Sequence, residues 1–180
     1  MPQRRIIVSH HRNVSRTLHA AYITGVAWIA VAALSAGHRA LADELVEIKE
    51  LPGKLRVEID GELFTEYLYQ DFAKPIFYPL LGPGGVPMTR SYPMVEGVAG
   101  EAEDHPHQKS LWFTHGNVND VDFWAEGEDC GRIEQVRILH RASGPGQATL
   151  ATENRWVDAA GKVICRDTRE FWFHADRGAR

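Results

Sequence analysis

The sequence predicts an all-β protein, most simply an antiparallel β-sandwich, and three observations support this. After position 42 no long segment has apolar residues at helical spacing. Short runs of alternating polar and apolar residues recur instead, separated by turn residues. Asp60-Gly61 joins two of these runs with the two-residue spacing of a tight hairpin. Together these patterns favour paired strands over helices.

The first strands are expected at LVEIKE (45–50), KLRVEI (54–59) and ELFTEYLYQ (62–70). The Asp60-Gly61 turn links the second of these strands to the third. The next apolar run, PIFYPLL (75–81), is bracketed by Pro75 and Pro79. Because proline cannot donate a hydrogen bond to a neighbouring strand, this run is expected at a sheet edge or a strand start.

A long segment rich in glycine and proline, residues 82–103, follows this run. A loop of this length inside a compact domain is typically functional or disordered. SLWFTHG (110–116) after it has the composition of a buried strand. The next strand, RIEQVRILHRAS (132–143), draws its apolar content from Ile133, Val136, Ile138 and Leu139.

A second hairpin is predicted near the end of the chain. ATLATENRWVD (148–158) and KVICRDTREFWFHAD (162–176) are joined by the turn at 159–161. Trp156 and Trp172 are expected to be large apolar anchors. Since the sequence stops directly after this strand, we expect the last strand to lack a neighbour and the domain to be incomplete.

Residues 1–42 have the composition of a signal peptide. They carry Arg4, Arg5, Arg12, Arg16 and Arg39 and no acidic residue. An apolar run (20–37) is followed by the small-x-small site Ala40-Leu41-Ala42. Cleavage after Ala42 predicts a periplasmic or secreted domain at 43–180, with no stable membrane insertion. The alternative is an uncleaved membrane anchor, because a run of about 20 apolar residues can span a bilayer.

The exported part is acidic, because all 24 acidic residues follow position 42 while five of the 20 basic ones precede it. Such a charge disfavours nucleic acid, whose binding rests on clustered lysine and arginine. The two cysteines, Cys130 and Cys165, would enter an oxidising compartment. A disulfide between them and two independent thiols both remain open.

The stretch DHPHQKSLWFTHG (104–116) contains three of the nine histidines. In an extended chain His105 and His107 project to one side. With His115 or Asp104 they would form a site for a divalent metal. The glutamate that usually follows an H-x-H pair in metal-binding barrels is absent, which weakens this interpretation.

The same residues also suit acid–base chemistry without a metal. A histidine can exchange a proton near neutral pH, with Asp104 as its orienting carboxylate. Sugar sites combine aromatic faces with charged and polar groups, and the candidate substrate-binding residues are Arg90, Tyr92, Trp112, His115 and Trp124. The structural alternative is a loop in which the histidines and Asp104 only satisfy backbone groups.

Two segments, KPIFYPLLGPGGVPMTRSYPM and DHPHQKSLWFTHGNVNDVDFW, resemble the exported bacterial family that carries the automatic label "methane oxygenase PmoA". The resemblance covers about residues 45–176. The family motif matches Pro75, Tyr78, Pro79, Gly85, Thr89, Arg90, Asp104, His105, Pro106, His107, Ser110, Trp112, His115, Gly116, Asp122, Phe123 and Trp124. Gln108 departs from the pattern, since members often carry a histidine there. Members are also typically longer, so the resemblance implies that this chain is the N-terminal portion of such a domain.

The resemblance implies an exported β-sandwich akin to the mutarotase-like, sugar-active sandwiches. The label itself is a misnomer, because methane monooxygenase subunits are membrane proteins. We expect a carbohydrate-active or carbohydrate-binding protein that uses His105, His107 and Asp104. The alternatives are a metal-dependent oxidoreductase and a non-catalytic domain of an exported assembly.

Overall fold

The computed structural model describes residues 43–175. The predicted signal peptide at 1–42 lies outside these residues. Within 43–175 there is no helix with the length and apolar content needed to cross a membrane. Strands account for nearly all of the regular structure, so the predicted all-β class is confirmed.

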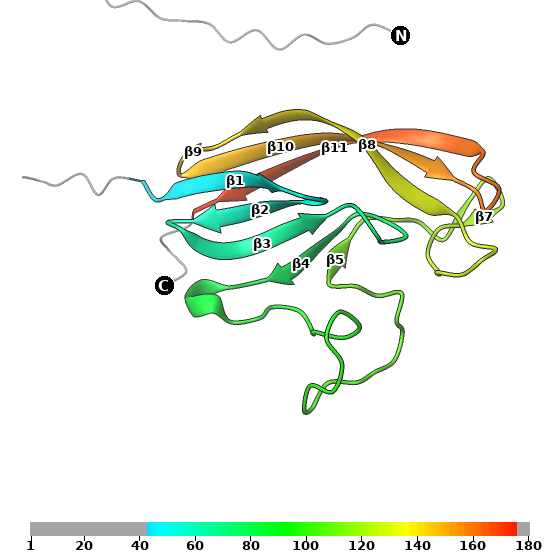
Figure 1. Ribbon diagram of the computed structural model, residues 1–180, viewed down its shortest axis with the longest axis horizontal. Coiled ribbons are helices and arrows are strands. Elements are labelled where there is room, and N and C mark those ends of the chain that lie inside the picture. Colours follow the sequence, from blue (N-terminus) through cyan, green and yellow to red (C-terminus); the bar gives the residue numbers. More distant parts are fainter. Residues whose placement is uncertain (1–42, 176–180) are drawn as a thin grey trace, which may run out of the picture. The chain divides into compact units, whose positions relative to one another are not determined.

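The first sheet is antiparallel, with the strand order β5-β4-β3-β2-β1-β9 (Figure 1). Its strands are β1 (Leu45–Leu51), β2 (Lys54–Ile59), β3 (Glu62–Leu68), β4 (Ile76–Leu80), β5 (Leu111–Trp112) and β9 (Gly144–Pro145). The predicted hairpin between β2 and β3 is confirmed. Asp60 and Gly61 both have positive φ, 51° and 81°, as a tight hairpin turn requires.

The second sheet has the order β11-β10-β8 and is also antiparallel. It consists of β8 (Arg132–Ala142), β10 (Gln147–Val157) and β11 (Val163–His174). The predicted hairpin through residues 159–161 is confirmed. Within 43–175, β11 pairs with a strand on one side only. The remaining elements are a two-residue hairpin, β6 (Asn117–Val118) with β7 (Val121–Asp122), and a 3-10 turn η1 (Pro83–Gly85).

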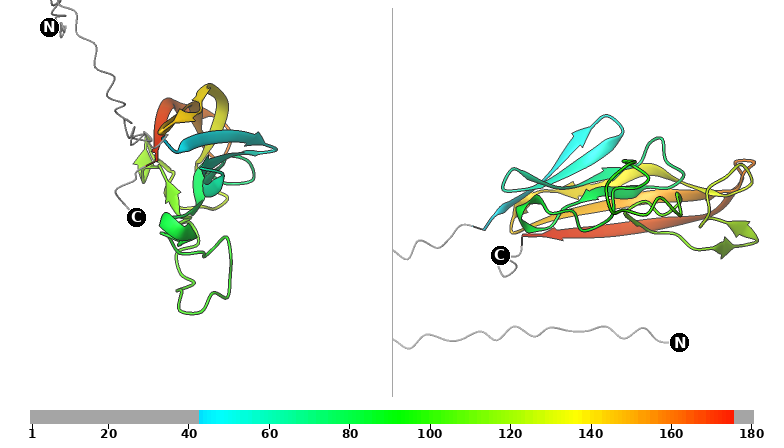
Figure 2. Two further views of the ribbon diagram at one scale, coloured as in Figure 1. Left: turned by 90° about the vertical axis from the view of Figure 1, so that its left-hand side faces the viewer. Right: turned by 90° about the horizontal axis from the view of Figure 1, so that it is seen from below.

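The two sheets pack face to face around a shared apolar core. This core comprises Val46, Ile48, Leu55, Val57, Tyr67 and Phe77 from the first sheet and Ala148, Leu150 and Phe173 from the second. Aromatic contacts cross between the sheets, with the rings of Phe77 and Phe171 4.9 Å apart. The predicted antiparallel sandwich is therefore confirmed. The segment between β4 and β5 leaves the sandwich as a long loop (Figure 2).

The predicted buried strand at 110–116 is wrong. Only Leu111 and Trp112 pair with a neighbour, namely Phe77 and Ile76 at the start of β4. Leu111 and Phe113 are 48% and 59% exposed. The ladder ends after these two pairs. Phe113 beyond it touches the second sheet through Trp156 and Arg169 but stays largely exposed. The half of β4 that contains Pro79 has no β5 residue beside it; there the returning chain pairs instead, with the Met88 amide donating to the Leu80 carbonyl at 2.9 Å.

Three apolar residues that the sequence singles out in the second sheet face solvent. Trp172 is 59% exposed because strand alternation points its neighbours, Phe171 and Phe173, toward the first sheet. Val136 and Leu139 are each 44% exposed. The β8–β10 register shifts at these two positions, and each bulge absorbs one residue without a cross-strand partner. Simple alternation therefore fails in β8.

Candidate functional site

Arg90 ties the loop between β4 and β5 together. Its guanidinium donates to the Asp104 carboxylate at 2.6 Å and to the backbone carbonyls of Asp104, His105 and Ala102 at 2.7, 3.1 and 3.3 Å. It also lies over the Tyr92 ring, 5.4 Å from the ring centre. The two predicted substrate-binding residues Arg90 and Tyr92 are thus brought together. The hydrogen bonds that Arg90 donates all go to the loop itself.

Asp104 and His105 form the predicted carboxylate–imidazole pair. The second Asp104 oxygen lies 3.0 Å from His105 Nδ1, and both side chains are 57% exposed. The hydrogen bond from Arg90, aided by that from His105, lowers the pKa of Asp104 below its ordinary value. Asp104 therefore stays ionised at neutral pH, where it orients the imidazole and leaves Nε2 free.

Four rings continue from this pair in an edge-to-face series, which we call the aromatic row. Its members are His105, His107, Trp124 and Trp112. Successive ring centres are 5.8, 6.2 and 4.7 Å apart. Edge-to-face contacts at these separations are favourable beyond the area that they bury. The row brings together four of the residues that the sequence singles out, and Trp124 in it remains 43% exposed.

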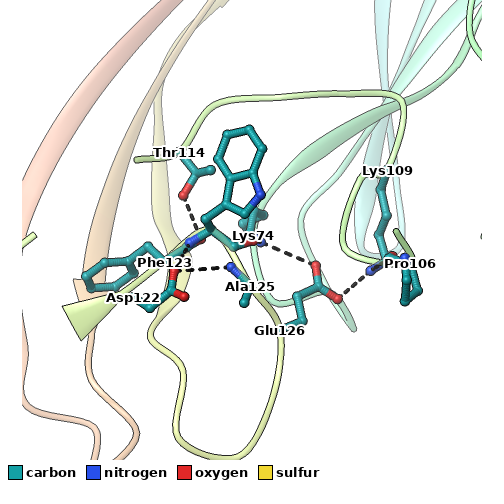
Figure 3. A network of polar contacts seen from close by, with 9 residues as sticks. Lys74, Pro106, Lys109, Thr114, Asp122, Phe123, Ala125 and Glu126 are labelled. Carbon is teal, nitrogen blue, oxygen red and sulfur yellow. Dashed lines mark hydrogen bonds and ion pairs between the residues drawn. The ribbon is translucent and has the colours of Figure 1, made fainter. Parts of the chain in front are cut away.

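A chain of two lysines and one glutamate supports the aromatic row, and the sequence does not reveal it. Lys74 is 1% exposed and donates to the Trp124 carbonyl at 3.1 Å and to Glu126 at 3.4 Å (Figure 3). Its ammonium lies 5.0 Å from the centre of the Trp112 ring. Lys109 pairs with the other Glu126 oxygen and donates to the Pro106 carbonyl at 2.9 Å.

The burial of Lys74 has an electrostatic consequence. Desolvation lowers its pKa, and the nearby carboxylate of Glu126 opposes that effect. Loss of Glu126 would therefore leave a buried ammonium without a counter-ion, which is costly. No spacing pattern marks Lys74, Lys109 and Glu126 in the sequence, because they are up to 52 positions apart and meet only in the fold.

A pocket of about 400 Å³ opens beside the aromatic row. It is lined by Phe72, Pro93, Met94, Pro106, His107, Lys109, Ala125 and Glu126. This volume falls in the range of small-molecule sites, which combine apolar walls with a few polar groups. His107, Lys109 and Glu126 supply those groups, whereas the Asp104–His105 pair lies outside the lining.

Local hydrogen bonds place Trp124 next to this pocket. The Asp122 carboxylate accepts from the amides of Trp124 and Ala125 at 2.7 and 3.2 Å, and the Thr114 hydroxyl donates to the Phe123 carbonyl at 2.7 Å (Figure 3). Phe123 is fully buried in a second apolar cluster with Ile133 and Trp156. Phe123 thus anchors the turn in the protein, while Trp124 stays at the surface.

The predicted three-histidine metal set is not assembled. His115 is exposed and belongs to neither the pocket lining nor the aromatic row. Across residues 43–175 no group of three or more histidine, cysteine, aspartate or glutamate side chains is arranged to hold a metal ion. Past Trp112 the chain no longer pairs with β4, and His115 makes no ring contact with His105 or His107.

Of the two alternatives for the cysteines, the structure has independent thiols rather than a disulfide, since Cys130 and Cys165 are both free. Cys165 lies on β11 opposite Trp156 and packs against the second apolar cluster. Cys130 closes the turn before β8, where its amide donates to the Gly127 carbonyl. Each sulfur is thus accommodated by its own local packing.

Residues 54–180 match the model of DUF6807, described as a family of unknown function. This chain belongs to that family. No curated protein and no solved structure matches it. The matched residues include β2 to β11 and therefore every residue of the candidate site.

Proposed function

We propose that this chain is a carbohydrate-binding protein whose sugar lies in the pocket beside the aromatic row. The observation that carries the proposal is the combination of that pocket with the exposed ring of Trp124 next to it. Sugars present both apolar faces and hydroxyl groups. An aromatic surface next to His107, Lys109 and Glu126 offers contacts to both.

The chemistry of the pocket mouth extends this proposal to proton transfer. His107 would contact the bound sugar, and the Asp104–His105 pair would act at the mouth as the general base. Arg90 lowers the pKa of Asp104 further below its ordinary value, so the carboxylate is fully charged at neutral pH. Arg90 would then be a positioning residue, and Trp124 the residue that orients the sugar.

The test is calorimetric titration of the full chain with a panel of neutral and uronate-containing oligosaccharides. We expect His107→Ala to weaken binding at least tenfold, because it removes a polar group of the lining. His115→Ala is the matched control, since this exposed histidine lies outside the pocket, and its affinity should equal that of the wild type. Absence of binding across the panel, or equal losses in both variants, would contradict the proposal.

One observation favours a second candidate, a non-catalytic domain of an exported assembly. The four bonds from Arg90 show that part of the motif braces its own loop. Under this alternative, substitution of His107 lowers stability and leaves sugar binding unchanged. The calorimetric comparison therefore separates the two functions.

The resemblance of the motifs at 74–94 and 104–124 to the PmoA-like family, which implies a mutarotase-like sandwich, supports the sugar proposal. Export is likewise part of the proposal, on the basis of the composition of residues 1–42. A metal-dependent oxidoreductase has less support, because the predicted ligands do not converge.

A further inference from the structure

A second hollow, of about 280 Å³, lies on the three-stranded sheet. It shares no lining residue with the pocket beside the aromatic row, which we call the loop pocket. It is lined by His140, Thr149, Leu150, Ala151, Glu170, Phe171 and Trp172. These residues come from all three strands of the sheet. We call it the sheet hollow.

The strand register explains why the surface is depressed here. Ala151 on β10 lies opposite Glu170 on β11 and opposite His140 on β8. The small methyl group thus sits between two longer side chains and forms the floor. The next row places Trp172 opposite Thr149, and His140 Nε2 lies 3.2 Å from the Thr149 hydroxyl. The hollow therefore has an aromatic wall, a small floor and polar groups on both sides.

The side chains of the sheet hollow are available to a ligand. Trp172 is 59% exposed, and its side chain has no ring contact or hydrogen bond within 43–175. The indole N–H of Trp156 on the inner face, by contrast, donates to Asp167 at 2.6 Å. The Trp172 ring, held on a strand and turned toward solvent, therefore offers an aromatic face that a ligand can cover.

The charges around the hollow also differ from those elsewhere on the sheet. Further along β8 and β10, Arg137 pairs with Glu153 at 2.6 Å and Arg155 with Glu134 at 2.7 Å. The Glu170 carboxylate has no ion pair or hydrogen bond within 43–175. An unneutralised carboxylate repels anions and accepts hydrogen bonds from hydroxyl groups.

We propose that the sheet hollow is a second saccharide site that takes a neutral oligosaccharide. One sugar ring would pack its apolar face against Trp172, above Ala151. Glu170 would accept from a ring hydroxyl, and His140 with Thr149 would bond hydroxyls on the opposite side. The free carboxylate and the acidic chain disfavour uronates and sulfated sugars. The proposal does not depend on the loop pocket.

The experiment is ¹⁹F NMR of the full chain labelled with 5-fluorotryptophan, in which each indole gives its own resonance. The Trp172 and Trp124 resonances are assigned from Trp172→Phe and Trp124→Phe. The probes are neutral hexasaccharides built from glucose, xylose, mannose, galactose or N-acetylglucosamine, and hexagalacturonate serves as the anionic comparison. We expect at least one neutral hexasaccharide to shift the Trp172 resonance saturably, and hexagalacturonate to leave it unmoved.

Variants of the lining residues then distinguish specific sugar binding in the sheet hollow from nonspecific binding to the protein surface. Glu170→Gln should weaken the response several-fold, and Trp172→Phe more strongly. Val136→Ala, an equally outward position on β8 outside the hollow, should leave it unchanged. Failure of every neutral sugar to move the Trp172 resonance would overturn the proposal. So would a shift that tracks protein concentration alone, which indicates contact between copies. Because the Trp124 resonance reports on the loop pocket separately, the proposals for the two sites are tested independently.

Discussion

Two arginine–aspartate pairs in this chain have the same chemistry and different surroundings. In the inner cluster, Arg169 donates to Asp167 at 2.8 Å and lies 4.9 Å from the Phe113 ring centre. In the loop cluster, Arg90 donates to Asp104 at 2.6 Å and lies over the ring of Tyr92. The side chains of the inner pair are 8% and 23% exposed, those of the loop pair 25% and 57%.

The partners of the two carboxylates follow from this difference in burial. Asp167 also accepts from Asn154 at 2.7 Å and from the Trp156 indole at 2.6 Å, so every donor around it belongs to the sandwich. Asp104 shares its second oxygen with His105, an exposed side chain whose ring centre lies 5.8 Å from that of His107 in the pocket lining. Asp167 links β11 to β10 through Asn154 and Trp156, and loss of one partner of a buried pair is costly. An exposed pair contributes little to stability and can position a reactive group.

The largest expected effect is that of Asp167→Ala. It leaves the buried Arg169 without a counter-ion and removes the acceptor of two further donors. Loss of one partner of a buried ion pair costs about 3–5 kcal/mol. Urea denaturation should therefore show a strongly reduced free energy of unfolding, while the matched change in the loop cluster, Asp104→Ala, leaves the midpoint nearly unchanged. Equal effects of the two substitutions would refute the contrast between the clusters.

A smaller effect at alkaline pH is expected from Tyr67, which lies against the inner cluster. Burial raises its pKa from 10.0 to about 12, against smaller opposing effects of Thr152 and Arg169. The folded state then binds the phenolic proton more tightly than the unfolded state. Stability from this group is complete below pH 10 and falls as pH rises from 10 to 12, by roughly 2–3 kcal/mol at 1.36 kcal/mol per pKa unit.

Tyr67→Phe isolates this effect. The difference in unfolding free energy between wild type and variant should change across pH 10 to 12 and stay constant from pH 6 to 9, where the phenol is neutral in both states. Denaturant titrations at a series of pH values measure it. Tyr92→Phe, in the loop cluster, is the control variant. Parallel pH profiles for wild type and Tyr67→Phe would show that Tyr67 ionises as easily in the folded state as in the unfolded chain.

The smallest effect on stability, and the most local one, is expected for Arg90→Ala. Removal of the guanidinium should raise the pKa of Asp104 toward its ordinary value of 3.8 and speed amide exchange across the loop at 82–110. The global unfolding midpoint should stay close to that of the wild type. ¹³C NMR titration of the carboxylates and hydrogen exchange provide the measurements. Arg137→Ala, which breaks a surface pair on β8, should leave both loop readouts unmoved.

The fold was predictable to a large extent because its signals are local. The Asp60-Gly61 turn and the alternating runs at 54–59 and 148–158 depend on neighbours in the sequence, and the structure confirms them. The wrong predictions arise where strand pairing in the folded chain differs from what the local sequence pattern indicates. Residues 110–116 read as a strand but find a partner for only two positions, and the bulges of β8 turn Val136 and Leu139 outward.

The candidate site was predictable only in part. The sequence singles out His105, His107 and Asp104 because they are adjacent, and also Trp112 and Trp124 because of their type. It misses Lys74 and Glu126, which meet at 3.4 Å although 52 positions separate them. It also joins His115 to a ligand set that the fold does not form. The sequence predicts Trp172 as an apolar anchor, whereas the structure exposes its ring to solvent. Strand alternation identifies the two faces of a strand but not which of them a second sheet covers.

The sequence by itself determines that this chain folds as paired strands, where its hairpins turn, and which segment carries the histidines and Asp104. These properties come from side-chain period, turn residues and adjacency, all of which act over a few positions. Tertiary structure alone decides which arginine–aspartate pair is buried and which is exposed, and which tryptophan reaches solvent. These outcomes depend on which face of a strand a second sheet covers, and contacts between residues far apart in the chain set that coverage.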